Sequence, residues 1–245
     1  MNKYYCDLHV HSCLSPCGDD EMTPANIAGM ASINGLNIVA LTDHNTSKNC
    51  PVFFKHAKEN GIIPIAGMEL TTAEDIHIIT LFRTLEDALD FDSYVDKRRI
   101  KIKNKAEIFG NQYIMGDDDS VIGSEEYLLI NATTITIEEA YKEVISRGGA
   151  VYPAHIDRTA NGIVAMLGTF PDYPEFSVYE LNDDNNDSEY KKKFPLLKEL
   201  RKVVSSDAHY LWNISEANFY IELDDEPYSS SNVRNKLIDY LSGKR

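Results

Sequence analysis

Short apolar runs alternate with amphipathic stretches along most of the chain. The apolar runs predict strands at residues 3–8, 37–41, 62–66, 76–82, 150–153, 176–180, 202–205 and 217–222. Helices are predicted from Thr23-Pro24, where a capping hydroxyl precedes a proline, and over 51–60 and 137–147, each followed by glycine. Alternating strands and helices predict a parallel sheet with right-handed crossovers, and this many units in one domain favours closure into a barrel.

One segment interrupts this alternation. Residues 84–109 are a highly charged helical stretch, and residues 110–134 have the composition of a loop and hairpin. Mixed charge runs are usually solvated faces, and a role in covering substrate is the alternative. Because no Pro/Gly/Ser linker divides the chain, we predict one barrel domain over 1–245 with an insertion at about 84–134 near its mouth.

Six of the seven histidines lie at or beside the ends of predicted strands, each near a carboxylate or another histidine. The candidate ligands are His9, His11, His44, Glu69, His77, His155, Asp207 and His209. Residues two apart on a strand point the same way, so His9 and His11 can reach one ion. Imidazole nitrogen and carboxylate oxygen are the usual ligands of Zn²⁺, Mn²⁺ and Fe²⁺. The pattern predicts a multinuclear metal site in a hydrolase, with His56, on a predicted helix, outside it.

Composition limits the partners and the compartment. The formal net charge is −15 and no basic stripe is present, so we expect no long nucleic acid, whereas a small phosphorylated molecule held by metal and one or two arginines is compatible with this charge. No signal peptide and no apolar stretch near 18 residues is found, which predicts a cytoplasmic protein without a membrane partner. The four cysteines, Cys6, Cys13, Cys17 and Cys50, are too few for a disulfide framework and are expected to be reduced.

The order of these motifs resembles a known family. The motifs are His9-x-His11, Thr42-Asp43-His44, Gly67-x-Glu69, His77, Pro153-Ala154-His155-x-x-Arg158 and Ser206-Asp207-Ala208-His209. Together they resemble the PHP (polymerase and histidinol phosphatase) family of metal-dependent phosphoesterases. The resemblance implies an α/β fold, a distorted (βα)₇ TIM-like barrel of the amidohydrolase-like kind, with two to three divalent ions (Zn, Mn or Fe) at the strand ends.

The resemblance also implies which residues bind each ion. It assigns His9, His11 and Asp207 to one ion, Glu69 as a bridge to a second ion on His77 and His155, and a third ion to His44, His209 and one ligand from the loop after His11. Relatives often have Ser-Asp-Gly in that loop, whereas here it is several residues longer. Counting back from Thr23-Pro24 places Asp19 at the ligand position, and Asp20 and Cys17 remain alternatives.

The expected chemistry is hydrolysis of a phosphate ester of a small metabolite or short nucleotide by attack of metal-bound water. Glu69, Asp207 and His209 are the expected catalytic residues, the latter two as proton carriers. Arg158 suits bidentate binding of a phosphate, with a surface salt bridge as the plain alternative. The alternatives to this function are a histidinol-phosphate phosphatase, a non-catalytic metal-binding or regulatory module, and hydrolysis of a C–N bond as in amidohydrolases.

Overall fold

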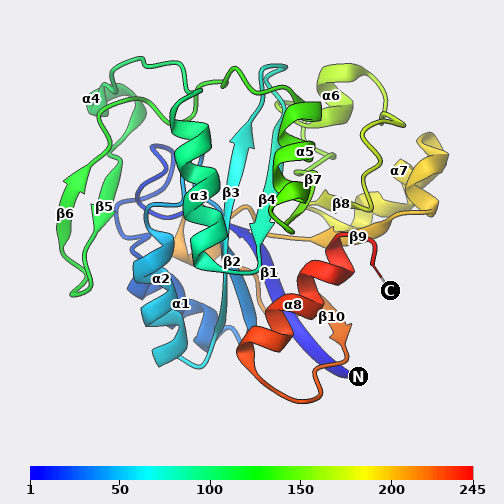
Figure 1. Cartoon of the computed structure of the whole chain (residues 1–245), viewed down its shortest axis with the longest axis horizontal. Coiled ribbons are helices and arrows are strands. Elements are labelled where there is room, and N and C mark those ends of the chain that lie inside the picture. Colours follow the sequence, from blue (N-terminus) through cyan, green and yellow to red (C-terminus); the bar gives the residue numbers. More distant parts are fainter. Residues whose placement is uncertain (245) are drawn as a thin grey trace.

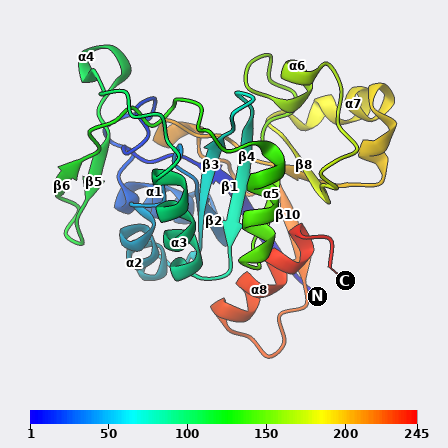
Figure 2. The same cartoon turned by 45° about the horizontal axis from the view of Figure 1, so that its top comes forward.

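The computed structural model describes residues 1–244 and shows an α/β fold with a curled, half-barrel sheet (Figures 1 and 2). The sheet has the order β10-β1-β2-β3-β4-β7. Its strands are β1 (Asn2–Val10), β2 (Ile38–Leu41), β3 (Ile63–Thr71), β4 (His77–Phe82), β7 (Ala150–Pro153) and β10 (Tyr220–Leu223). Two smaller ladders are β5 (Tyr113–Met115) with β6 (Val121–Ser124), and β8 (Val178–Leu181) with β9 (Arg201–Val204).

Strand direction differs from the all-parallel expectation. β1, β2 and β3 are parallel, but β4 pairs antiparallel with both β3 and β7, because a short loop over residues 72–76 turns the chain directly back. β10 is also antiparallel to β1. In the described residues, the strand-like pairing between β1 and the segment after β9 is an isolated bridge from Val10 to Ala208. The described residues therefore pair as an open sheet and a separate β8–β9 ladder, not as one closed ladder of seven strands.

The predicted helices form near their predicted bounds. The longer helices are α1 (Pro24–Ile33), α2 (Cys50–Glu59), α3 (Leu85–Asp96), α5 (Ile137–Ser146) and α8 (Ser230–Leu241). Thr23 caps α1 as expected, and Thr136 forms a reciprocal capping box with Glu139 at the start of α5. Short helices are α4 (Ala106–Phe109), α6 (Ile163–Leu167), α7 (Asp187–Lys193), η1 (Asp184–Asn186), η2 (Pro195–Lys198) and η3 (Leu211–Asn213). Among residues 1–244, no helix has the length and apolar character needed to cross a bilayer.

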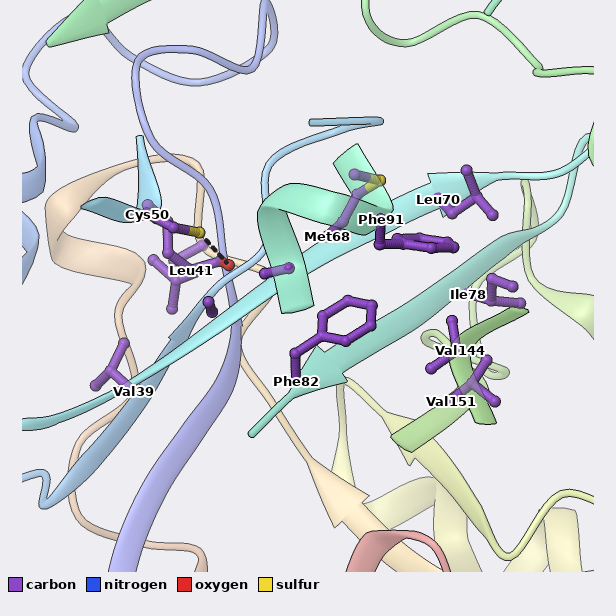
Figure 3. Close-up of a cluster of buried hydrophobic side chains, with 14 of the residues drawn as sticks. Val39, Leu41, Cys50, Met68, Leu70, Ile78, Phe82, Phe91, Val144 and Val151 are labelled. Carbon is purple, nitrogen blue, oxygen red and sulfur yellow. Dashed lines mark hydrogen bonds between the residues drawn. The ribbon is translucent and has the colours of Figure 1, made fainter. Parts of the chain in front are cut away.

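The sheet separates two apolar clusters. The inner cluster takes alternate residues of the strands, such as Ile63 and Ile65, and is completed by Leu237 and Ile238 of α8. The outer cluster lies between the sheet and its covering helices, where Phe82 of β4 meets Phe91 of α3 (Figure 3). Helix α8 packs against the inner cluster, and the other long helices cover the outer face. The polar residues therefore gather at the edge of the sheet where β1, β2, β3 and β7 end.

Residues 84–109 do not form the single charged helix that the sequence predicts. Helix α3 ends at Asp96 and packs on the sheet, while the chain beyond it forms α4 and the β5–β6 hairpin. Several charges of the segment are paired rather than solvated. Arg99 is 8% exposed and pairs with Asp96 at 2.6 Å and with Glu125 at 3.0 Å, and Lys48 also pairs with Glu125. These contacts fix the segment to the loop that precedes α2.

Replacing Phe91 with alanine tests how much α3 contributes to the outer core. The ring lies 5.3 Å from that of Phe82, between their centroids, and is fully buried. We expect Phe91→Ala to lower the free energy of unfolding by about 3–5 kcal/mol, measured by urea titration, because a buried aromatic leaves a cavity. Ile108→Ala, on α4 and 65% exposed, is the control and should change it by less than about 1 kcal/mol. Equal effects would contradict the packing described.

Candidate metal centre

A single carboxylate lies at the centre of the polar edge. Glu69, on β3, is 1% exposed and is surrounded by nitrogens of five imidazoles. The distances to Oε1 are 3.4 Å from His9 Nε2, 2.8 Å from His77 Nδ1 and 3.0 Å from His155 Nε2, and those to Oε2 are 3.3 Å from His11 Nε2 and 3.0 Å from His44 Nδ1. The predicted convergence of these residues is therefore present in the structure.

A local irregularity in β1 aims two of these imidazoles inward. Leu8 belongs to the inner cluster and Val10 to the outer one, yet His9 and His11 both face Glu69. Strict alternation would place His9 on the face opposite to Leu8. The pairing of β1 with β2 shifts register between Asp7 and Val10, and such bulges re-aim side chains. As a result, the Nε2 atoms of His9 and His11 lie 3.1 Å apart.

The remaining ligands depend on strand reversal and on unusual backbone. Because β4 runs backward, its first residue, His77, lies diagonally opposite Glu69 on the same face. His155 and Asp207 follow β7 and β9 and have positive φ angles of 26° and 53°. Non-glycine residues in that region cost about 1–3 kcal/mol each, and such strain is concentrated at functional sites.

The ligand atoms fall into three overlapping groups, within each of which they lie no more than 4.8 Å apart. The groups are His9, His11, Glu69 and Asp207; His44, Glu69 and His77; and His11, His44 and His209. His155 is outside all three, but its Nε2 is 3.3 Å from His77 Nδ1 as well as 3.0 Å from Glu69. Asp207 Oδ1 completes the first group at 3.3 Å from His9 Nε2 and 3.1 Å from His11 Nε2.

Hydrogen bonds fix which nitrogen of three histidines is available. His9 Nδ1 lies 2.8 Å from Glu180 Oε1 and therefore donates to it. Ser15 Oγ donates its one proton to Asp43 Oδ1 at 2.7 Å, so it accepts from His11 Nδ1 at 3.0 Å. His209 Nδ1, 2.8 Å from the carbonyl oxygen of Asp207, donates in the same way. The Nε2 atom of each ring is left as a ligand, the arrangement that outer carboxylates and carbonyls impose on metal-binding histidines.

The donor set fits divalent metal ions. His44 Nδ1 and Asp207 Oδ1 are buried and make no hydrogen bond of good geometry, although Glu69 and the imidazoles lie within 3.3 Å. Lone pairs that face one another across such short distances are stabilised by a cation between them. Nitrogen and oxygen donors of this kind suit Zn²⁺, Mn²⁺ or Fe²⁺. Glu69, shared by two of the groups, is placed to bridge two ions.

The charges of the metal-free cluster compensate one another. Burial raises the pKa of Glu69, but the imidazoles of His77, His9 and His44 outweigh it and hold the pKa well below its usual value. Burial likewise opposes protonation of His9, yet Asp207, Glu180 and Glu69 raise its pKa well above normal, and the pKa of His11 rises to about 9. Metal ions that bind here must therefore displace protons.

The loop after His11 departs from the expectation for Asp19. The Asp19 carboxylate accepts a hydrogen bond from the Glu21 backbone N–H at 2.9 Å, and the structure does not bring it into any ligand group. A short carboxylate is readily taken up by such a local turn. Asp20 is held by Asn111. Cys17 instead reaches the site, with Sγ 3.1 Å from His209 Nε2.

Several residues of the site were not among the sequence candidates. Glu180 Oε1 accepts from His9 and also from the His155 backbone N–H at 3.1 Å, which ties β8 to β1 and β7. Asp7 accepts from the backbone N–H groups of Ser206 and Ser215, before and after the Asp207 turn. For Glu180 and for Asp7, the signal in the sequence was a single carboxylate inside an apolar, strand-like run. His56 lies outside the site, as predicted, and pairs with Glu59.

The cluster opens into a cavity of about 290 Å³. Its lining includes Cys17, Arg158, Asn161 and, from the segment 84–134, Ile130. Arg158 is half-exposed, with Nη1 2.7 Å from Asp207 Oδ2 and Nε 2.7 Å from Asn182 Oδ1. Arg158 therefore forms a salt bridge, but with the buried Asp207 of the cluster and not with a surface acid, and its role as a phosphate ligand stays a prediction.

Comparison with known proteins identifies the class. The model of the PHP domain family matches residues 7–226, and the chain belongs to this family. An uncharacterised protein of Methanocaldococcus jannaschii is 37% identical over 84 residues, which cover 31% of this chain and 48% of that protein. A 5′-3′ exoribonuclease of Haemophilus influenzae is 38% identical over 84 residues, 33% of this chain and 29% of the enzyme. The matches thus span about half or less of these relatives.

Solved structures share the fold at low sequence identity. Endonuclease Q from Pyrococcus furiosus superposes with a TM-score of 0.69 at 18% identity, covering 99% of this chain and 56% of that protein. A metal-dependent phosphoesterase candidate from Bifidobacterium adolescentis superposes with a TM-score of 0.58 at 18% identity, and the match covers 95% of both chains. An amidohydrolase from Chromobacterium violaceum superposes with a TM-score of 0.53 at 16% identity, and the match covers 90% of this chain and 92% of that protein. These similarities confirm the predicted α/β fold.

The expectation that long nucleic acid is excluded as a partner is wrong. A structure of endonuclease Q holding a 27-mer duplex shares this fold, with a TM-score of 0.62, 19% identity and coverage of 86% of this chain and 50% of that protein. Net charge is an average over the molecule, whereas phosphate binding depends on where cations lie. The charge of −15 therefore does not decide the size of the partner.

Removing the charge of Glu180 tests its effect on the ligands. We expect Glu180→Gln to weaken Zn²⁺ binding about 10- to 100-fold, because His9 and the His155 backbone lose the charged acceptor that orients them. Competition with a chromophoric chelator measures the affinity. Glu189→Gln, on the exposed surface of α7, should leave it unchanged. Equal affinity in both variants would show that Glu180 does not support the centre.

Proposed function

We propose that the chain is a metal-dependent phosphoesterase that hydrolyses a phosphate ester of a small metabolite or short nucleotide. The observation that carries the proposal is the buried Glu69 carboxylate with five imidazole nitrogens within 3.4 Å, open to a cavity on whose wall Arg158 lies. Family membership supports metal-dependent hydrolysis. The substrate class rests on the size and charge of the cavity.

The distances between the side chains suggest which residues would hold each ion. One ion would be held by His9, His11, Glu69 and Asp207, a second by Glu69, His77 and His155 with His44 adjacent, and a third by His44 and His209. Divalent ions at such positions supply an activated water and offset the negative charge of a phosphoryl group. The outer residues Glu180, Ser15 and Asp43 keep the imidazole rings oriented for this task.

Substrate would be positioned by the residues that face the opening. The guanidinium of Arg158 can bind phosphate oxygens in a bidentate manner while Asn182 holds its Nε. A volume of about 290 Å³ is at the small end of ligand sites, which favours a terminal phosphate with a compact remainder. A neighbouring hollow of about 450 Å³ shares His77, Arg158 and Asn161, and gives room for the rest of a nucleotide.

Proton transfer would fall to His209 and Asp207 when these side chains are not fully committed to metal. Burial and the neighbouring His11 lower the pKa of His209 to about 4, so its Nε2 is unprotonated at neutral pH and can accept a proton. His209 is the most exposed imidazole of the cluster, with 19% of its side chain accessible, and lies at the cavity. Asp207, paired with Arg158 through Oδ2, would orient the reacting groups and would share the proton only when Oδ1 is not bound to an ion.

A second candidate function is cleavage of a nucleic-acid phosphodiester. The exoribonuclease relative and the fold shared with endonuclease Q favour it. Histidinol phosphate remains a candidate small substrate, since the cavity accepts any compact phosphate ester. A non-catalytic or regulatory module is less consistent with a ligand set in which each position holds a competent donor.

The central test combines metal analysis with substrate screening. Protein purified without chelator should contain divalent metal and release phosphate from at least one of nucleotides, 3′,5′-bisphosphates, sugar phosphates or histidinol phosphate, or cleave a single- or double-stranded oligonucleotide. His9→Ala should lower the rate at least about 100-fold, since it removes a ligand and its link to Glu180. His56→Ala, outside the site, is the control and should retain full activity. Activity that survives His9→Ala, or no activity on any substrate, would reject the proposal.

The third ion has its own test. We expect Cys17, not Asp19, to be the loop ligand, because its sulfur lies 3.1 Å from His209 Nε2 whereas Asp19 caps a turn. Thiolate is a normal ligand of Zn²⁺ and related ions. Cobalt-substituted protein should show a sulfur-to-cobalt absorption band in the near ultraviolet that Cys17→Ser abolishes and Asp19→Asn preserves. Loss of one equivalent of metal in Asp19→Asn alone would assign that role to the carboxylate.

A further inference from the structure

A second large hollow lies far from the metal centre, between α2 and α8. Its volume is about 740 Å³, and its lining includes Phe54, Lys55 and Lys58 of α2, Arg83 after β4, and Arg234 of α8. In Figure 1 both helices lie in the lower part of the view, whereas β3, which carries Glu69, ends near the top. His77 begins β4 at the metal centre and Arg83 follows its other end, so about 20 Å of strand separates the two places.

The lining of this groove is basic in an otherwise acidic protein. Among its lining residues Glu59 is the only acid, and it pairs with His56. Arg83 is satisfied by Asp239 at 2.6 Å and by two backbone carbonyls. Lys55 donates to the carbonyl of Asp117 and keeps its charge, without a carboxylate partner in the described part of the chain.

Arg234 is the least satisfied of these cations. Its Nε and Nη1 atoms are buried without a hydrogen-bond partner, and within residues 1–244 no carboxylate lies within 4.0 Å of its guanidinium. The guanidinium carbon lies 5.7 Å from the centre of the Phe54 ring, and Lys58 Nζ lies 5.8 Å from the same ring. A partly buried cation without a counter-ion is unfavourable, and an anion in the groove would remove that cost.

We propose that this groove is a second, non-catalytic binding site for a small phosphorylated molecule that carries at least two negative charges. The charge of the Arg234 guanidinium would attract the phosphate groups, and Lys58 and Lys55 would add charge from the opposite wall. Three cations without carboxylate partners favour a multiply charged phosphate over a single carboxylate. A volume of about 740 Å³ accommodates a molecule the size of a nucleoside diphosphate.

Titration calorimetry of the 245-residue chain with pyrophosphate and with ADP tests the site. The His9→Ala protein should still bind one equivalent, because the groove does not depend on the metal centre. Arg234→Gln should weaken that binding at least tenfold, and Lys58→Glu should do the same. Lys97→Glu, an exposed lysine outside the groove, is matched to Lys58→Glu in charge and should bind like the parent.

The outcomes separate this site from the centre at Glu69. Pyrophosphate should raise the melting temperature of His9→Ala and fail to raise that of the double variant with Arg234→Gln. Absence of saturable binding to His9→Ala would overturn the groove site and leave the phosphoesterase proposal standing. An equal loss in Lys97→Glu would show that general charge, not the groove, attracts the anion.

Discussion

The structure depends on one buried carboxylate, that of Glu69, staying ionised although it is almost inaccessible to water. Glu69 is nearly inaccessible, and its two oxygens are approached by five imidazole nitrogens from four separate strands or strand ends. A buried carboxylate is strongly unfavourable unless cations surround it. In the absence of metal, imidazoles that hold extra protons meet this need, as the raised pKa values of His9 and His11 show. The same positions suit divalent cations, which carry more charge in less space.

The arrangement of the core explains why the polar cluster can exist at one edge only. The inner cluster is filled by aliphatic side chains of the strands and by α8, and the outer face is covered by helices. Polar ligands are thus held against a rigid apolar base, and solvent reaches them from the cavity beside Arg158. Strain in the backbone at His155 and Asp207 is tolerated because paired strands precede both residues, and single backbone hydrogen bonds hold Ile156 and Ala208 directly after them.

The sequence predicted which residues gather but not how the chain delivers them. Histidines and acids at the ends of apolar runs pointed to the candidate ligands, because parallel strands end at a common edge and apolar alternation reveals the strands. The bulge in β1 and the reversal of β4 were not predictable in this way, since both depend on pairing with neighbours rather than on local composition. His77 was expected on its strand, yet it reaches Glu69 only because that strand runs backward.

Two other differences come from interactions between distant residues. Asp19 fitted the spacing of a ligand, but a local hydrogen bond to Glu21 takes up its carboxylate and leaves Cys17 beside His209. Glu180 is separated by 171 positions from His9, whose ring it orients, and nothing in the surrounding apolar run distinguishes it from a structural acid. Net charge also led to the wrong prediction about long nucleic acid, because it carries no information on where cations cluster. The basic groove beside Arg234 illustrates this.

The reversal between β3 and β4 limits how this chain can vary. Thr71 pairs with His77 across the turn, and side chains alternate faces along each strand. A slip of one residue in this hairpin would turn His77 toward the helices and leave Glu69 short of a partner. Length changes at residues 72–76 are therefore tolerable only when the added residues bulge outward without moving the pairing of β3 with β4.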